Sequence, residues 1–95
     1  LDFSSNSKLT SLKITHSEIN DLETSNYDNL DKITSLDLSF NQLQTLNVSR
    51  FILLETLNIV GNSNLDCIEV NQNQLSSIPT TWIKDSSAEY NIDCK

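Results

Sequence analysis

The sequence predicts a solenoid, a right-handed coil of short turns whose strands stack side by side into a parallel sheet. A motif of two apolar residues and an asparagine occurs twice with a spacing of 21 positions, as Leu36, Leu38 and Asn41 and again as Leu57, Ile59 and Asn62. The apolar residues alternate with polar neighbours, which is the pattern of a strand with one buried face. One such strand cannot bury that face alone, but stacked copies of it enclose a continuous apolar core.

The asparagines stand where each predicted strand ends and the chain turns inward. Backbone groups buried in such a turn need hydrogen-bond partners, and an asparagine side chain can supply them. We therefore expect Asn41 and Asn62 to form a ladder from coil to coil.

The second half of each coil carries its own apolar pair. Leu46 and Val48 follow Leu36 and Leu38 by 10 positions, in the part of the coil that returns along the back. A coil of 21 residues leaves little room there for a helix. We expect extended or irregular structure on that side.

The repeats divide the chain into residues 1–65 and a C-terminal cap, residues 66–95. The repeats begin with a partial coil over 1–11 and continue as coils over 12–35, 36–56 and 57–65 onward. The coil 12–35 has Ser17 at the ladder position and contains an insertion-like acidic stretch. Because Leu1 and Phe3 place the start of the chain in the back half of a coil, we expect further coils or another chain to precede it.

The cap departs from the period. Residues 67–70 keep a strand-like pattern, which fits either a last strand of the front sheet, including Glu69, or a segment of the back. Residues 77–84 predict a short helical turn, because Ser77 can cap it and proline is tolerated in a first turn. Trp82 is expected to cover the open end of the core beside Ile78 and Ile83; a ligand-stacking role is the less favoured alternative.

Cys67 and Cys94 are the only cysteines. An even number, placed to tie the tail to the solenoid, indicates a disulfide and an oxidising compartment. Free thiols or half of a metal site are the alternative. A metal site lacks its other ligands, since His16 is the only histidine and belongs to a distant coil.

Composition excludes several classes of function. The chain has 95 residues, enough for one domain, and a formal net charge of −7, which opposes binding to nucleic acid phosphates. No apolar run approaches the roughly 20 residues that span a membrane. No signal peptide is evident. The sequence indicates no cofactor. Acidic residues gather around the insertion, namely Glu18, Asp21, Glu23, Asp28 and Asp31; a calcium site is conceivable, but their spacing favours a solvated acidic face.

These motifs carry a resemblance to a known family. The spacing of leucines and asparagines is similar to the leucine-rich repeat, of the α/β horseshoe class with short coils. The run Asn62–Val70, followed by Trp82, Asp85, Ala88 and Cys94, resembles the terminal cap of secreted flavobacterial (Bacteroidota) leucine-rich-repeat proteins. The resemblance implies export to the cell surface or the medium. Ser17, the long first coil and the apolar residues 51–53 depart from the family pattern; at least one of these last three is expected in the core.

A parallel coil presents the outward residues of its strands as one concave surface. Here those residues are Lys13, Thr15, His16, Asp37, Ser39, Phe40, Asn58 and Val60. One aromatic among short polar and charged groups suits a protein partner, with Phe40 as candidate anchor or, alternatively, as a spacer beside the ladder. A glycan, the other possible partner, more usually requires several exposed aromatics.

Two further classes of function remain as alternatives. The first is a structural or accessory role, as the capped end of a larger surface protein with no ligand of its own. The second is an enzyme, which the sequence disfavours because it holds no pairing of nucleophile and base and no glycine-rich phosphate loop. The sequence therefore favours an extracellular interaction module.

Overall fold

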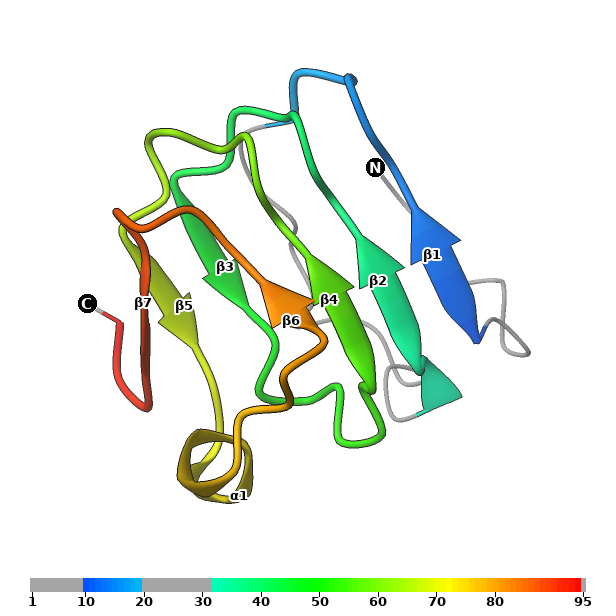
Figure 1. Cartoon of the computed structure of the whole chain (residues 1–95), viewed down its shortest axis with the longest axis vertical. Helices are drawn as coiled ribbons and strands as arrows, with labels where there is room; N and C mark the ends of the chain where they lie inside the picture. The colour runs from blue at the N-terminus through cyan, green and yellow to red at the C-terminus, as the bar shows by residue number, and fades with distance from the viewer. Residues whose placement is uncertain (1–9, 20–31, 95) are drawn as a thin grey trace.

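The chain forms a solenoid of about three turns, built of two parallel sheets with little helix (Figure 1). The computed structural model describes residues 10–19 and 32–94. Its elements in chain order are β1 Ser11–Lys13, β2 Ser35–Asp37, β3 Thr45–Asn47, β4 Thr56–Asn58, β5 Cys67–Glu69, α1 Gln72–Ser76, β6 Trp82–Ile83 and β7 Glu89–Asn91. The expected solenoid of short, mostly β coils is thereby confirmed at the level of architecture.

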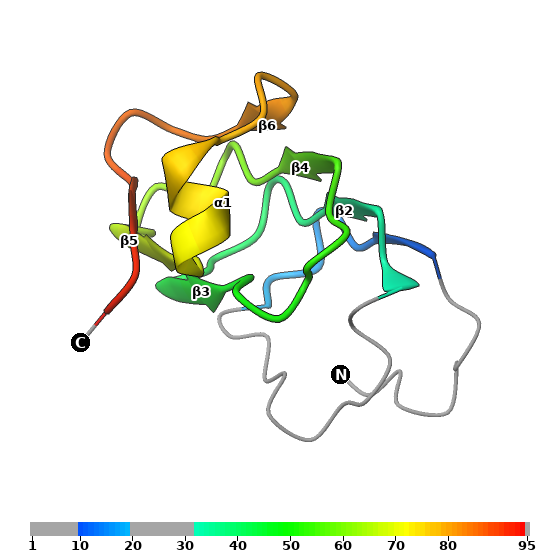
Figure 2. The same cartoon turned by 90° about the horizontal axis from the view of Figure 1, so that it is seen from below.

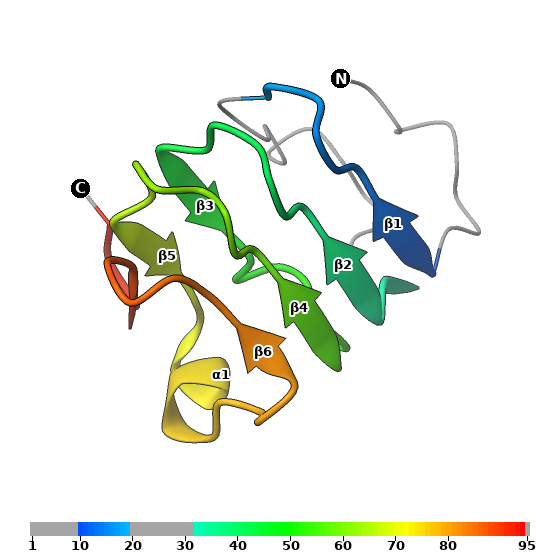
Figure 3. The ribbon, with the colours of Figure 1, turned by 45° about the horizontal axis from the view of Figure 1, so that its top comes forward.

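The front sheet contains β1, β2, β4 and β6 in that order, all parallel (Figure 3). Its register places Leu12, Leu36, Leu57 and Trp82 in one row across the four strands. Leu36 and Leu57 are each only 1% exposed, as the alternation of apolar and polar residues requires. The 21-residue repeat therefore corresponds to one step across this sheet.

The back sheet contains β3, β5 and β7, again parallel. It settles the position of residues 67–69, because β5 pairs with β3 and β7 and not with the front sheet. Glu69 therefore lies at the back. The extended structure expected around Leu46 and Val48 is present as β3, and both residues are buried.

The core lies between the two sheets, which form separate layers in Figure 2. Its buried members come from both sheets and the turns between them, and they include Phe51, which is fully buried. The neighbouring Ile52 and Leu53 are 63% and 56% exposed. Of the apolar run 51–53, one residue thus packs in the core and two face solvent.

The prediction of a helical turn over 77–84 was wrong. The helix α1 lies earlier, and Asn71 caps it through a reciprocal pair of hydrogen bonds with Gln74, a capping box. Ser77 lies at the C-terminal end of the helix. Residues 82 and 83 extend along β4 because the front sheet offers them a row of unpaired backbone groups.

Trp82 therefore continues the buried row of the front sheet, and it is 7% exposed. Its neighbour Ile83 points to the opposite side of the strand and is 46% exposed. The prediction that Ile83 packs beside Trp82 was therefore wrong. Ile78 does pack against the core, partly buried.

The same two residues that cap α1 also attach it to the preceding coil. The Asn71 side chain donates to the Ser49 carbonyl at 2.8 Å. The Gln74 side chain donates to the carbonyls of Val48 and Phe51 at 3.0 and 3.2 Å. A helix of one and a half turns is too short to be stable by itself, and these contacts hold it in place.

The disulfide between Cys67 and Cys94 is confirmed, with 5.8 Å between the Cα atoms. It joins β5 to the chain beyond β7, and the Cys94 amide also donates to the Glu69 carboxylate at 3.3 Å. Closing a loop with a sequence separation of 27 contributes about 3–4 kcal/mol in the chain-entropy model.

Asn41 and Asn62 each connect one coil to the coil before it. The Asn62 side chain donates to Ile59 O in its own coil at 2.9 Å and to Leu38 O in the preceding coil at 3.1 Å, and it accepts from the Leu43 amide at 3.1 Å. Asn41 likewise donates to Leu38 O at 2.9 Å and Ile14 O at 2.8 Å and accepts from the Ser17 amide at 2.9 Å. The Leu38 carbonyl therefore accepts from both side chains.

Asp85 makes similar contacts from the coil that contains β6 to the coil before it. Its carboxylate accepts from the backbone amides of Gly61 and Asn62 at 3.2 and 3.0 Å. The Asp85 carboxylate thus satisfies amides of the coil before it, as the side-chain oxygens of Asn41 and Asn62 do.

Replacing Asn62 by alanine is expected to lower the free energy of unfolding by about 3 kcal/mol, because the buried Leu43 amide and Ile59 carbonyl lose their partner and the Leu38 carbonyl keeps only Asn41. Urea denaturation followed by tryptophan fluorescence measures the loss. Asn58→Ala is the matched control, since Asn58 accepts a single local hydrogen bond at 3.3 Å, and its cost should stay below about 1 kcal/mol. Equal losses in the two variants would contradict a structural role for the Asn62 contacts.

Alkaline pH is expected to destabilise the fold through Tyr90. Burial raises the pKa of the Tyr90 phenol above its usual value of 10.0, so the folded chain holds this proton more strongly than the unfolded chain. The contribution of the protonated Tyr90 phenol to the free energy of unfolding is complete below about pH 10. It is lost as the pH rises through the pKa of Tyr90 in the folded chain.

Thermal melts from neutral to strongly alkaline pH test this dependence. The Tyr90 hydroxyl has no hydrogen-bond partner among the described residues, so Tyr90→Phe should preserve stability at neutral pH and reduce the alkaline loss. An unchanged alkaline loss in the variant would assign it to other groups.

Candidate functional site

The outward side of the front sheet is arranged in rows that run across the coils. The register places Lys13 beside Asp37, Asp37 beside Asn58, and Asn58 beside Ile83. Because the asparagine contacts and the buried leucines together hold this register, residues far apart in sequence come together on one face. Three of the predicted binding residues, Lys13, Asp37 and Asn58, therefore share a row.

Not all of these predicted residues are free to meet a partner. The Asp37 carboxylate accepts from the Ser39 amide at 3.0 Å and from the Ser39 hydroxyl at 2.7 Å. Ser39 itself is only 4% exposed. Ser39 and Asp37 hold the turn after β2 through these hydrogen bonds, which leaves the Ser39 side chain little surface for a partner. Thr15 and Val60 are half-buried.

The next row is formed by His16, Phe40 and Gly61, which follow the ends of three successive front strands. Backbone hydrogen bonds join the row, from His16 N to Phe40 O at 3.0 Å and from Phe40 N to Val60 O at 2.9 Å. All three residues have a positive φ, of 54°, 58° and 78°. At this point in these three coils the chain takes a left-handed residue before it turns in to the ladder position.

The Phe40 ring lies between its two neighbours in this row. It stacks on His16 with 4.9 Å between ring centroids and 12° between ring planes. On its other side, a Cβ at Gly61 would lie 2.5 Å from Phe40 Cδ1. The ring therefore covers the only glycine of the sequence, and Phe40 remains 52% exposed.

An open depression of about 340 Å³ surrounds this row, and we call it the aromatic depression. It is lined by His16, Glu18, Phe40, Asn41, Gln42 and Gly61. The Gln42 amide donates to Ile19 O at 2.9 Å, which sets the position of the Gln42 backbone beside the first coil.

All four residues of the described ranges that have a positive φ line the aromatic depression. His16, Glu18 and Phe40 are not glycine, and a left-handed conformation costs such residues about 1–2 kcal/mol each. Strained residues gather at functional sites because the surrounding structure holds them in place. Their concentration here makes this depression the candidate site.

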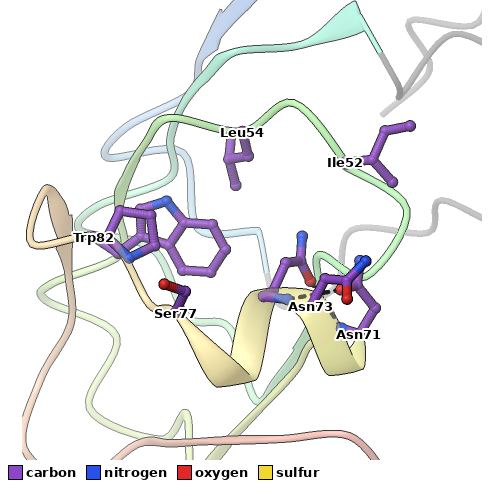
Figure 4. A pocket seen from close by; sticks show the side chains of 8 residues that line it. Ile52, Leu54, Asn71, Asn73, Ser77 and Trp82 are labelled. Atoms are coloured by element: carbon purple, nitrogen blue, oxygen red, sulfur yellow. Dashed lines mark hydrogen bonds between the residues drawn. The ribbon is translucent and has the colours of Figure 1, made fainter.

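A second hollow, of about 210 Å³, lies between α1 and the turn that precedes β4 (Figure 4). Ile52, Leu54, Pro79 and Trp82 give it apolar walls, and the side chains of α1 and its ends give it a polar rim. No charged side chain lines it. Trp82 is part of the wall and is almost wholly buried, so it offers little surface for stacking on a ligand.

Over residues 10–19 and 32–94, no group of three or more histidine, cysteine, aspartate or glutamate side chains could hold a metal ion. Asp21, Glu23, Asp28 and Asp31 of the acidic insertion lie outside these ranges, as do Leu1 and Phe3. The same ranges contain no helix that is long and apolar enough to cross a membrane.

Sequence reasoning did not single out Gly61 and Gln42 for this site. The signal for Gly61 was present, because the only glycine occupies the position 21 residues after Phe40. Gln42 has no such signal, since glutamine is common on exposed turns.

Comparison with known proteins adds no relative: no family model, no curated protein and no solved structure matches the chain.

Gly61→Ala is expected to displace the Phe40 ring and to lower the free energy of unfolding by about 1–2 kcal/mol, because the new Cβ meets the ring and the backbone is left-handed. Calorimetry measures the stability, and the NMR shifts of the His16 ring protons report whether Phe40 still stacks on it.

A double variant separates the clash with the Phe40 ring from the strain of the left-handed backbone. In the double variant Phe40→Ala, Gly61→Ala the clash is gone, so its loss should be smaller than the sum of the single losses. Strict additivity, with His16 shifts unchanged in Gly61→Ala, would show that the ring does not cover Gly61 in solution.

Proposed function

We propose that the chain is a leucine-rich-repeat interaction module that binds a protein partner on the outward side of its front sheet. The parallel coils, the 21-residue step and the asparagine contacts support membership of that class. The disulfide is compatible with an oxidising, extracellular location. The resemblance of the cap to secreted flavobacterial proteins supports a place on the cell surface or in the medium.

The aromatic depression is the observation that carries this proposal. Phe40 is a large exposed apolar side chain surrounded by polar and charged residues, which is the composition of an interface anchor within a polar rim. The stack with His16 limits its movement, so little side-chain entropy is lost when a partner covers it.

The geometry of Phe40 favours a protein over a glycan. A sugar ring binds an aromatic side chain by stacking on its face, and the faces of Phe40 are directed at His16 and Gly61. The ring presents its edge to a partner. Apolar side chains and backbone groups of a protein pack against such an edge without needing the face.

The second candidate is a structural or accessory role, as the capped end of a larger surface protein. The observation in its favour is the way the last coil ends. Asp85 takes the backbone amides of the coil before it, β6 has only two residues, and the disulfide holds the tail. These features close a stack of coils and require no ligand.

Affinity capture from a surface extract tests the choice between these candidates. The bait is the chain itself beside the double variant Phe40→Asp, Lys13→Glu, with Ile52→Asp as the matched control on an exposed residue outside the depression. Circular dichroism first establishes that all three baits fold alike. We expect a partner retained by the chain and the control to be reduced at least about tenfold by the double variant.

Two other results would count against binding at this face. Equal capture by all three baits would move the contact to another surface. No specific partner for any bait would favour the structural role.

A further inference from the structure

Glu18 is the charged residue of the aromatic depression, and nothing in the described ranges neutralises it. It is exposed, and no hydrogen bond or ion pair joins it to another described residue. Its backbone is left-handed, with a φ of 59°, a conformation that glycine or asparagine would adopt at lower cost. Glu18 thus places a carboxylate at the margin of the hollow beside Phe40, and it has no partner within residues 10–19 and 32–94.

The exposed edge of Phe40 determines what can lie next to that carboxylate. The edge of a phenyl ring carries a positive partial charge, so a bare cation gains nothing by resting on it. An aliphatic chain packs well there. A side chain with an apolar stem and a cationic head satisfies both surfaces, since long basic side chains pack their stems on apolar groups and extend their heads to a charge.

The overall charge of the chain acts in the same direction. With a formal net charge of −7, the molecule attracts basic partners and repels acidic ones. Lys13, the one lysine or arginine among the predicted binding residues, is not among those that line the depression.

We propose that the aromatic depression binds an arginine or lysine side chain from a basic segment of the protein partner. The stem packs on the edge of Phe40, and the cationic head pairs with Glu18, with the Gln42 carboxamide as a further acceptor within the same hollow. This inference rests on the proposed function, and it names the chemistry of the partner at that site.

An NMR titration of the full chain tests the inference with two probes that differ only in charge. The first is the blocked peptide acetyl-Gly-Arg-Gly-amide, and the second carries citrulline, a neutral isostere, in place of arginine. We expect the arginine peptide to shift the amide signals of Glu18, Phe40 and Gln42 saturably, with a Kd of ~1 mM. The citrulline peptide should bind about fivefold more weakly, the size of an exposed ion pair.

Two Glu→Gln variants test whether the preference for the arginine peptide comes from the Glu18 carboxylate. Glu18→Gln should weaken binding of the arginine peptide about fivefold and remove the preference over citrulline. Glu55→Gln neutralises an exposed carboxylate just before β4 and outside the depression. It should change neither the affinity for the arginine peptide nor the preference over citrulline. Raising the salt concentration should weaken binding to the chain more than binding to Glu18→Gln.

Three results would overturn the inference: equal binding of the two peptides, equal effects of the two variants, or no shift in the depression at about 10 mM arginine peptide, ten times the expected Kd. The failure of this inference differs from the failure of the proposed function. A captured partner that is lost with Phe40→Asp, Lys13→Glu but retained with Glu18→Gln keeps the binding face and removes the cation site.

Discussion

The fold depends on the pairing of backbone groups that each coil carries into its interior. Every turn from a front strand to the back places amides and carbonyls away from water, where each unpaired group costs about 1–3 kcal/mol. Asn62 is fully buried and pairs such groups in two successive coils at once. The asparagine contacts therefore satisfy the interior and also fix the distance and register between coils, which the leucine rows then fill.

This constraint also places the candidate site. For the asparagine to reach the interior, the chain must reverse just before it, and the residue at that point takes a left-handed conformation in the three coils that contain His16, Phe40 and Gly61. The Phe40 ring at this point is 52% exposed and stacks on His16. The strain and the exposed ring thus have a common origin in the ladder, and Gly61 leaves the space that the Phe40 ring occupies.

The coil that contains β6 differs from the coils before it. A parallel sheet leaves unpaired backbone groups at its edge, and long exposed edges invite association with other chains. Here β6 has two residues, the Asp85 carboxylate accepts from the amides of Gly61 and Asn62 in the coil before it, and the disulfide holds the segment after β7 against β5. Trp82 adds a larger ring to the buried row of leucines in the front sheet. The centroid of this ring lies 5.9 Å from that of the Tyr90 ring in the back sheet, and the two rings together cover this end of the core.

The sequence by itself determined the repeat, because its period follows from leucines and asparagines that must recur at every coil. It also determined the pairing of the only two cysteines and the exposure of Phe40, which stands at an outward position. Only the tertiary structure decided that residues 67–69 belong to the back sheet and that Trp82 forms a strand, because both depend on which neighbouring strand has free backbone groups. The same holds for the covering of Gly61 by Phe40 and for the place of Glu18 and Gln42 beside that ring. Contacts between coils join residues more than 20 positions apart, and local sequence carries no record of them.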